Sequence, residues 1–352
     1  MFFKILIRAL CISSMSFIKD KLDSLKKLIE YLQNIELHVK IMIYKNFMKI
    51  EVLDMNINLI GVPLFYGADK RGNEYAPQKL REKNIINVLT KHGHNVYDCG
   101  NVNVPDVKED DKFSYHPKMK YLNTIVEVNT NLAHLVASSL NFNCFPLIIG
   151  GDHSLGLGSI SGASKIYNNL AVIWLDAHGD LNTYNTTFSG NVHGMPLASA
   201  MGLGHEDLAN VYFKGKKVKP ENVFIIGARD LDSGENTIIQ NEKINVYSPK
   251  YIREKGIENI LNDIIHKLHK RNIEAIHLSF DLDFLDSTLV AGTGTPVKDG
   301  MSIEEAKTFF KELAQTKLIK SMDFVEFNTL LDVNDATANI SIDLLDYIFK
   351  YL

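Results

Sequence analysis

Short runs of apolar residues recur along the chain from Met55 onward, and each run is only a few residues long. Their nearly continuous apolar character is typical of strands that are buried on both faces of a sheet. The predicted strands cover residues 56–61, 145–149, 171–175, 223–226, 275–280 and 322–325. The pattern therefore predicts a sheet that is covered on both of its faces.

Segments with apolar residues at helical spacing lie between these runs. They predict helices over residues 121–140, 257–269 and 303–315. The last helix is preceded by Ser302-Ile-Glu-Glu305, a capping box in which the two outer side chains satisfy backbone donors reciprocally. Strands that alternate with helices in this way predict one α/β sheet that is mainly parallel.

The first 54 residues differ from the rest of the chain in composition. The first glycine is Gly61 and the first proline is Pro63, so all 22 glycines and 9 prolines follow this segment. We therefore divide the chain into an N-terminal extension, residues 1–54, and a single large domain, residues 55–352. An amphipathic helix is predicted in the extension from the helical spacing of Leu22, Leu25, Ile29, Leu32 and Ile35. The alternatives are a poorly ordered extension, a targeting peptide, or a true start at a later methionine.

The composition, with 45% hydrophobic and 23% charged residues, is that of an ordinary globular protein. A formal net charge of −4 disfavours a nucleic-acid-binding surface, which normally carries a basic excess. The absence of any run of about 18 apolar residues argues against a membrane span. Cys11, Cys99 and Cys144 form no CxxC pair, which argues against a thiolate metal site and favours a reducing compartment such as the cytoplasm.

Acidic and imidazole side chains follow three of the predicted strands. Ligands of open α/β sheets bind beyond the carboxyl ends of strands, and an i, i+2 spacing puts two side chains on one face of an extended segment. The candidate ligands are His153, Asp176, His178, Asp180, Asp281 and Asp283. Carboxylates gathered in one crevice repel each other unless cations neutralise them. The cluster therefore favours a pair of hard or borderline divalent ions such as Mn²⁺.

These segments resemble the ureohydrolase family, and in detail its bacterial-type arginases. The likeness extends from Asn56 to Asn328 and includes Gly67-Ala-Asp-Lys-Arg-Gly72 and Gly292-Thr-Gly-Thr-Pro-Val297. The resemblance implies a three-layer α/β/α fold with a central, mainly parallel sheet and two Mn²⁺ per subunit. It assigns one ion to His153, Asp176, Asp180 and Asp281, and the other to Asp176, His178, Asp281 and Asp283.

The resemblance also implies a substrate, L-arginine, which is hydrolysed to L-ornithine and urea by a hydroxide that bridges the two metals. The stretch from Asn182 to His193 resembles the arginase loop that binds the amino-acid end of the substrate. The implied substrate-binding residues are Asn182, Thr187, Ser189, Asn191, Asp230, Asp232, Glu235 and Thr295. The implied catalytic residues are Asp180 as a proton relay, His193 as a general base or proton shuttle, and Glu326 as the partner of the guanidinium.

Two positions depart from the usual family pattern. Phe284 follows a candidate ligand where the family normally has no side chain, so we expect it to narrow the site or alter metal affinity. Glu304 lies where many arginases have an arginine that supports subunit contacts, which leaves the expected homo-oligomer, a trimer or hexamer, open. The alternative functions are a ureohydrolase that acts on agmatine or a guanidino acid, and a non-catalytic metal-binding member. A single-zinc deacetylase of related architecture fits less well, because it needs fewer carboxylates.

Overall fold

The computed structural model describes residues 55–352, and every structural statement below concerns that part of the chain. The predictions for residues 1–54, including the amphipathic helix, lie outside the described residues. Within the described part, no helix has both the length and the apolar character that a membrane crossing requires.

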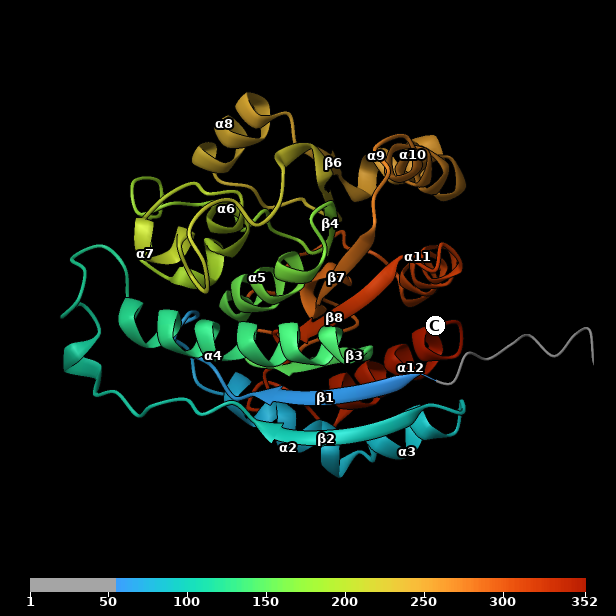
Figure 1. Cartoon of the computed structure of the whole chain (residues 1–352), viewed down its shortest axis with the longest axis horizontal. Helices are drawn as coiled ribbons and strands as arrows, with labels where there is room; N and C mark the ends of the chain where they lie inside the picture. Colours follow the sequence, from blue (N-terminus) through green and yellow to red (C-terminus); the bar gives the residue numbers. More distant parts are fainter. Residues whose placement is uncertain (1–54) are drawn as a thin grey trace, which may run out of the picture. The chain divides into compact units, whose positions relative to one another are not determined.

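A single eight-stranded sheet forms the centre of the domain (Figure 1). All neighbouring strands are parallel, and their order is β2-β1-β3-β8-β7-β4-β5-β6. The strands are β1 (Asn56–Val62), β2 (Asn95–Asn101), β3 (Cys144–Gly150), β4 (Leu170–Leu175), β5 (Val223–Ile226), β6 (Asn245–Tyr247), β7 (Ala275–Asp281) and β8 (Ile319–Val325). The predicted α/β class with a parallel sheet is confirmed.

Helices cover both faces of this sheet and complete the three layers (Figure 1). One face carries α4 (Leu122–Asn141), α5 (Gly156–Ile166), α6 (Pro196–Ala200) and α7 (Glu206–Ala209), and α8 (Ser233–Glu242) packs at its margin. The other face carries α2 (Ala76–Glu82), α3 (Ile85–Thr90), α9 (Pro249–Lys255), α10 (Ile257–Lys270), α11 (Ile303–Gln315) and α12 (Ala336–Phe349).

Successive strand residues contribute to opposite cores, which explains the unbroken apolar runs. In β4, Ile173 and Leu175 pack into the core beneath α10 and α11, whereas Val172 and Trp174 pack into the core beneath α4 and α5. Side chains of a strand alternate between faces, so a strand with an apolar core on each side, as β4 has, shows no polar face. The burial of both faces therefore produced the sequence pattern from which the strands were predicted.

Each of the predicted strands is present, with bounds that differ by at most a few residues. The sequence pattern missed β2 and β6, which are the two edges of the sheet, and most residues of β2 are exposed. The predicted helices correspond to α4, α10 and α11. The capping box of α11 is confirmed, since the Glu305 N–H donates to Ser302 Oγ (3.2 Å) and the Ser302 N–H donates to Glu305 Oε2 (2.7 Å).

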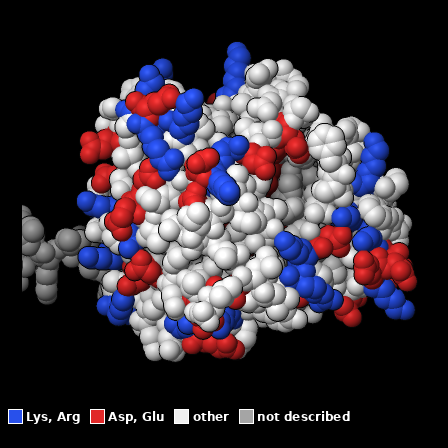
Figure 2. Space-filling view, turned by 180° about the vertical axis from the view of Figure 1, so that it is seen from behind, with Lys and Arg blue, Asp and Glu red and all other residues white. Residues whose placement is uncertain are grey.

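Charged side chains of both signs are interspersed on the face of the molecule seen in Figure 2, and no single sign dominates that face. The predicted site residues lie instead at the carboxyl edge of the sheet. The strands β3, β8, β7 and β4 are consecutive neighbours in its middle, so the segments that follow them meet at one place. These are the segments that contain His153, Glu326, Asp283 and Asp176.

Candidate active site

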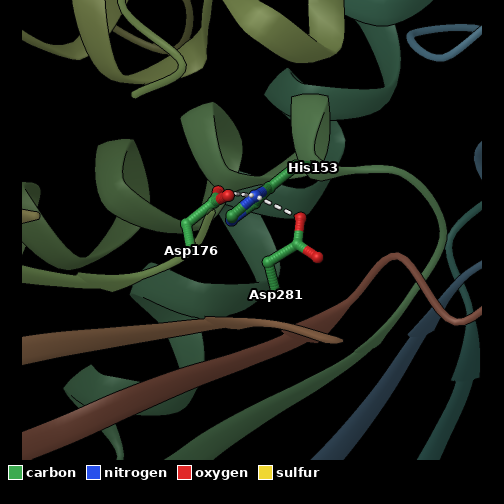
Figure 3. Close-up of side chains that lie close together, drawn as sticks. All are labelled: His153, Asp176 and Asp281. Atoms are coloured by element: carbon green, nitrogen blue, oxygen red, sulfur yellow. Dashed lines mark ion pairs between the residues drawn. The ribbon is translucent and has the colours of Figure 1, made fainter. Parts of the chain in front are cut away.

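His153 lies at the centre of a first group of candidate metal ligands (Figure 3). Its Nδ1 atom is 2.9 Å from Asp176 Oδ2, 3.1 Å from Asp281 Oδ2 and 3.2 Å from Asp180 Oδ2. Asp176 directly follows β4, Asp281 is the last residue of β7, and all four side chains are buried. The imidazole stacks on Trp174 of β4, with ring centroids 3.9 Å apart and planes 3° apart, which fixes the plane in which Nδ1 points.

A second group joins Asp176, His178 and Asp283. His178 Nδ1 lies 3.1 Å from Asp283 Oδ2 and 3.4 Å from Asp176 Oδ1. Within each of the two groups the ligand atoms lie within 4.8 Å of one another. Asp176 belongs to both groups, so the structure brings the predicted ligands together around two adjoining positions.

The local backbone aims these carboxylates. Asp176 Oδ1 accepts the N–H of His178 (2.7 Å), and Asp281 Oδ1 accepts the N–H of Asp283 (2.8 Å). Each aspartate therefore closes its own turn with one oxygen and leaves the other oxygen facing His153. Asp180 has a φ of 50°, in the left-handed region that non-glycine residues seldom adopt and that is enriched at functional sites.

The residues fit a pair of divalent cations. Among the described residues, His153 Nδ1 and Asp176 Oδ2 are buried and lie 2.9 Å apart, but the contact lacks hydrogen-bond geometry and neither atom has another hydrogen-bond partner. Burial, and after it the nearby Asp283 and Asp176 carboxylates, raises the pKa of Asp281. Burial and the Asp176 charge likewise raise the pKa of Asp180 to about 6. Cations would coordinate the poorly paired buried atoms and would offset the mutual repulsion of the carboxylates. A set of carboxylates with two imidazoles suits Mn²⁺ or a similar ion.

A buried polar network supports His153 from behind. His153 Nε2 lies 2.8 Å from Ser279 Oγ, and the Ser279 hydroxyl donates to Asp323 Oδ2 (3.4 Å). Asp323 Oδ2 also lies 2.9 Å from His277 Nε2. Partners of this kind fix the orientation of a metal-ligating imidazole. These supporting partners were not predicted from the sequence, although His277, Ser279 and Asp281 are polar at every second position of an otherwise apolar strand.

His193, whose side chain is 20% exposed, pairs with the buried Glu326 beside the first group. His193 Nδ1 lies 3.1 Å from Glu326 Oε1. Glu326 Oε1 also accepts the backbone N–H of His153 (2.8 Å), and Asn73 donates to Glu326 Oε2 (2.6 Å). Burial lowers the pKa of His193, but the hydrogen bond and charge of Glu326 outweigh it and raise this pKa to about 9. Asn73 was not predicted as a site residue, and it lies 253 residues from its partner in the chain.

A cavity of about 250 Å³ opens above these groups. It is lined by His153, His178, Asp180, Asn182, Thr187, Phe188, Ser189, Asn191, His193, Gly194, Asp230, Asp232, Glu235, Asp281 and Thr295. Of the predicted site residues, Asp176 and Asp283 lie beneath the cavity and Glu326 lies behind His193, so none of these three lines it. Phe188 and Gly194 line the cavity but were not predicted to do so.

Hydrogen-bond donors of the loop between Asn182 and Asn191 are aimed by internal contacts. Thr186 Oγ1 donates to Asn182 Oδ1 (2.9 Å), and Asn182 Nδ2 donates to Asp232 Oδ2 (2.8 Å). Thr187 Oγ1 accepts the N–H of Gly190 (3.0 Å), and Ser189 Oγ accepts the N–H of Asn191 (3.1 Å). Because both hydroxyl oxygens accept backbone hydrogens, their own hydrogens stay free to donate to a ligand.

The acidic side of the cavity is built differently. Glu235 accepts the N–H groups of Asp232 (2.8 Å) and Leu181 (3.0 Å), so it joins the start of α8 to the segment beside Asp180, and burial raises its pKa to about 7. The Asp230 side chain is 70% exposed at the mouth of the cavity. Thr295, which was predicted to bind substrate, donates to Asp283 Oδ2 (3.0 Å) and so contacts a candidate metal ligand.

Phe284 does not narrow the cavity, and this expectation from the sequence is wrong. Its ring is fully buried in the core, with ring centroids 5.7 Å from Phe280 and 6.3 Å from Phe309, and it is not among the lining residues. The core accommodates the Phe284 ring because residue 227 is a glycine, where an added Cβ would lie 2.5 Å from Phe284 Cδ2. The predicted effect of Phe284 on metal affinity stays a prediction.

The parallel sheet, with two adjoining groups of candidate carboxylate and imidazole ligands at its carboxyl edge, defines a three-layer α/β protein with a candidate metal site. The model of the arginase family matches residues 55–350, and the chain belongs to this family. It is 41% identical to an arginase of Brevibacillus brevis over 297 residues, which are 84% of this chain and 98% of that protein. It is 40% identical to an arginase of Staphylococcus aureus (strain COL) over 83% of this chain and 96% of that protein. The crystal structure of arginase from Bacillus cereus matches with a TM-score of 0.78 and 39% identity, covering 84% of this chain and 98% of that one.

Proposed function

We propose that this protein is a manganese-dependent arginase, which hydrolyses L-arginine to L-ornithine and urea. Membership of the arginase family and the relatives named arginase support this activity. The observation that carries the proposal is the pair of ligand groups that share Asp176, in which the buried His153 Nδ1 and Asp176 Oδ2 lie 2.9 Å apart and form no well-aligned hydrogen bond with any described residue.

Two Mn²⁺ per subunit are proposed for these groups. His153, Asp176, Asp180 and Asp281 would hold one ion, and Asp176, His178, Asp281 and Asp283 would hold the other. When bound, the ions supply Lewis acidity and lower the pKa of water, which makes the hydration of a guanidinium carbon feasible at neutral pH. The residues around the cavity then have to place that carbon and move protons.

The amino-acid end of arginine is assigned to the outer part of the cavity. Asn182 and Asn191 offer amide N–H groups, and Thr187 and Ser189 offer hydroxyls, to the α-carboxylate, directly or through water. Asp232 contacts the α-ammonium, while Asp230 and Glu235 support this contact through water or through Asp232 itself. Donors on one side of the cavity and carboxylates on the other match the two charges of an α-amino acid.

The guanidinium end is assigned to Glu326. A carboxylate has about four acceptor positions, and Glu326 uses three of them for His193, the His153 N–H and Asn73. One position therefore remains for a guanidinium N–H, which would fix the direction in which the carbon faces the ligand groups.

Two residues handle the protons. Asp180 takes the proton released when water adds to the guanidinium carbon, and passes it to the side-chain nitrogen of the substrate. The bond between that nitrogen and the carbon then breaks, which releases urea and the amine of L-ornithine. His193 acts as the proton shuttle at the mouth: Glu326 holds its Nδ1, and Nε2 exchanges protons with water.

The direct test is urea release by the Mn²⁺-loaded protein from arginine, agmatine and 4-guanidinobutyrate. Arginine is expected to be by far the best substrate. If agmatine or guanidinobutyrate were the preferred substrate, the protein would be a different ureohydrolase and not an arginase. Bound manganese without urea release from any of the three would leave a non-catalytic metal-binding protein.

Two matched variants test the ligand assignment at the same time. Asp281→Asn keeps the oxygen that accepts the Asp283 N–H and removes the charge that faces His153, so activity is expected to be lost. Asp286→Asn is the matched control. Asp286 lies on the same segment as Asp281, and its carboxylate accepts the N–H groups of Thr288 (2.9 Å) and Gly300 (2.9 Å). This control is expected to retain activity, and equal losses in the two variants would contradict the assignment.

Two further properties are proposed from family membership and composition. The protein is expected to be a homo-oligomer, a trimer or a hexamer, and sedimentation velocity gives the mass that decides between them. Cytoplasmic localisation is proposed because Cys99 and Cys144 are free thiols in the described part. Cell fractionation with an antibody against the protein tests this location.

A further inference from the structure

Lys120 is joined to the substrate-binding loop by two contacts. Its Nζ atom donates to Asn191 Oδ1 (2.8 Å), and its backbone N–H donates to Gly190 O (2.9 Å). The side chain is only 16% exposed, although it precedes α4 on the surface of the domain. Lys120 and Asn191 are 71 positions apart in the chain, and no role for Lys120 was predicted from the sequence.

The contact with Lys120 determines which way the Asn191 amide points. A lysine ammonium can only donate, so it binds the amide oxygen and excludes the flipped orientation. On its other side, Asn191 Nδ2 donates one hydrogen to Ala68 O (2.9 Å). The second N–H of this amide is therefore left to donate to a ligand in the cavity that Asn191 lines. A flipped amide would present an acceptor to that ligand instead.

Asp69 holds Lys120 in position. Its Oδ2 atom lies 2.8 Å from Lys120 Nζ and 3.5 Å from Lys112 Nζ. Burial raises the pKa of Asp69, but the hydrogen bond and charge of Lys120 outweigh it, so the carboxyl group is ionised at neutral pH. Lys120 therefore bridges Asp69 and Asn191, whereas Lys112 contacts Asp69 without contacting Asn191.

The charge of the cavity gives this bridge a function. Five of the lining side chains carry carboxyl groups, namely Asp180, Asp230, Asp232, Glu235 and Asp281, and within the described part no lysine or arginine lines the cavity. Asp230 and Asp232 are not among the proposed metal ligands, so bound cations do not neutralise them directly, and a substrate carboxylate that enters this part of the cavity meets their negative charge. Lys120 places a positive charge directly behind the amide that meets the carboxylate, which strengthens the N–H donor by polarisation.

We propose that Lys120 is a positioning residue that sets the specificity for a substrate α-carboxylate, by fixing the donor orientation of Asn191 and supplying the cation behind it. This inference rests on the proposed arginase activity. It adds one partly buried cation to the neutral donors by which the loop would bind a carboxylate.

Steady-state kinetics on arginine provide the first test. Lys120→Met is expected to raise the KM for L-arginine roughly tenfold to a hundredfold, the usual effect of losing a hydrogen bond that involves a charged group. Its kcat is expected to stay within about twofold, because Lys120 contacts no group that moves a proton. Lys120→Arg retains the cation and a donor and is expected to restore most of the affinity. Lys112→Met is the matched control and is expected to leave KM unchanged.

Binding of L-ornithine and of 1,4-diaminobutane, measured by calorimetry, gives a readout that does not depend on turnover. The two ligands differ only in the α-carboxylate. Lys120→Met is expected to weaken ornithine binding by the factor seen in KM and to leave diaminobutane binding unchanged. Asn191→Asp keeps a partner for Lys120 but removes the N–H donor, so it is expected to weaken ornithine binding as strongly, which tests the proposal even if Lys120→Met folds poorly.

Three outcomes would overturn the inference. They are a Lys120→Met variant with wild-type KM, a Lys112→Met variant with an equal shift, and an equal loss of affinity for both amines. Each of them leaves the proposed arginase activity standing as long as the wild-type protein releases urea from arginine. Absence of urea release by the wild-type protein would instead refute the proposed function itself.

Discussion

Replacement of Phe284 by leucine or alanine tests whether its ring stabilises the core or shapes the active site. The ring directly follows Asp283 in sequence, yet it packs between Phe280 of β7 and Phe309 of α11. The ring also packs against Gly227, which has a φ of 97° and no side chain, so that the ring occupies the space where a Cβ would lie. A smaller residue therefore opens a void that the Gly227 backbone cannot fill.

The expected cost follows from this packing. Truncation of a fully buried phenylalanine to alanine costs about 3–5 kcal/mol, because transfer free energy is lost and a cavity remains. Phe284→Leu keeps most of the volume and is expected to cost about 1–1.5 kcal/mol. Domains are stable by about 5–15 kcal/mol, so the leucine variant is expected to fold well and the alanine variant to be marginal. The KM and kcat for arginine are expected to stay at wild-type values in both folded variants, because the ring does not line the cavity.

Urea-induced unfolding of the metal-free proteins measures the loss of stability, and manganese binding and urea release measure the effect on the site. The leucine variant separates the two roles, since it is expected to stay folded. Wild-type stability of Phe284→Ala would refute the packing argument. A stable Phe284→Leu variant with an altered KM would show that the ring acts on the cavity, as the sequence alone had led us to expect.

Three other perturbations test the site and the domain. Asp281→Ala is expected to abolish urea release and weaken manganese binding, and near-normal turnover would contradict its place in both ligand sets. Asn182→Ala is expected to lower kcat/KM for arginine far more than for agmatine, which lacks the carboxylate, so an equal loss would move Asn182 out of carboxylate recognition. Asp346 lies 2.7 Å from Lys91 Nζ and 2.6 Å from His92 Nε2, and Asp346→Asn is expected to cost about 1 kcal/mol at pH 7. Burial raises the pKa of Asp346, but the hydrogen bonds from Lys91 and His92 outweigh burial, so the pKa in the folded protein lies below the usual value. The stabilisation by Asp346 is therefore fully present above the unfolded pKa near 3.9, and it is lost as the pH falls through the pKa of the folded protein. Chemical denaturation across that range measures it, and a difference from wild type that grows in acid would reverse the argument.

The middle of the sheet was predictable because burial on both faces is recorded in the residues themselves. Strand β4 is apolar throughout, and both of its faces meet a core. The edge strand β2 contains Asn95, Asp98 and Asn101 and is mostly exposed, so its hydrogen bonds with β1 have no counterpart in its hydrophobic pattern. Edge strands of this kind are specified by pairing with a neighbour, which a pattern along one segment does not report.

The candidate ligands were predictable for a related reason. Asp176 and Asp281 come at the ends of buried strands, where alternation along the strand fixes the direction of a side chain. Lys120 and Asn73, which position Asn191 and Glu326, were not predictable, because they act through contacts between segments that are far apart in the chain and have no regular periodicity. Their partners depend on loop conformation, and composition alone makes such residues look like ordinary polar surface.

This difference in origin predicts a difference in behaviour. The proposed metal ligands are held by strand ends and by turns that each aspartate closes for itself, as Asp281 does with the Asp283 N–H. The proposed donors for the substrate carboxylate are held by contacts within and between loops, such as those from Thr186 to Asn182 and from Lys120 to Asn191. Substitutions at the strand ends are therefore expected to change metal affinity and kcat together, whereas substitutions in the loop contacts are expected to change KM with the metals retained. Loss of manganese from a folded Lys120→Met variant would show that the two halves of the site are not independent.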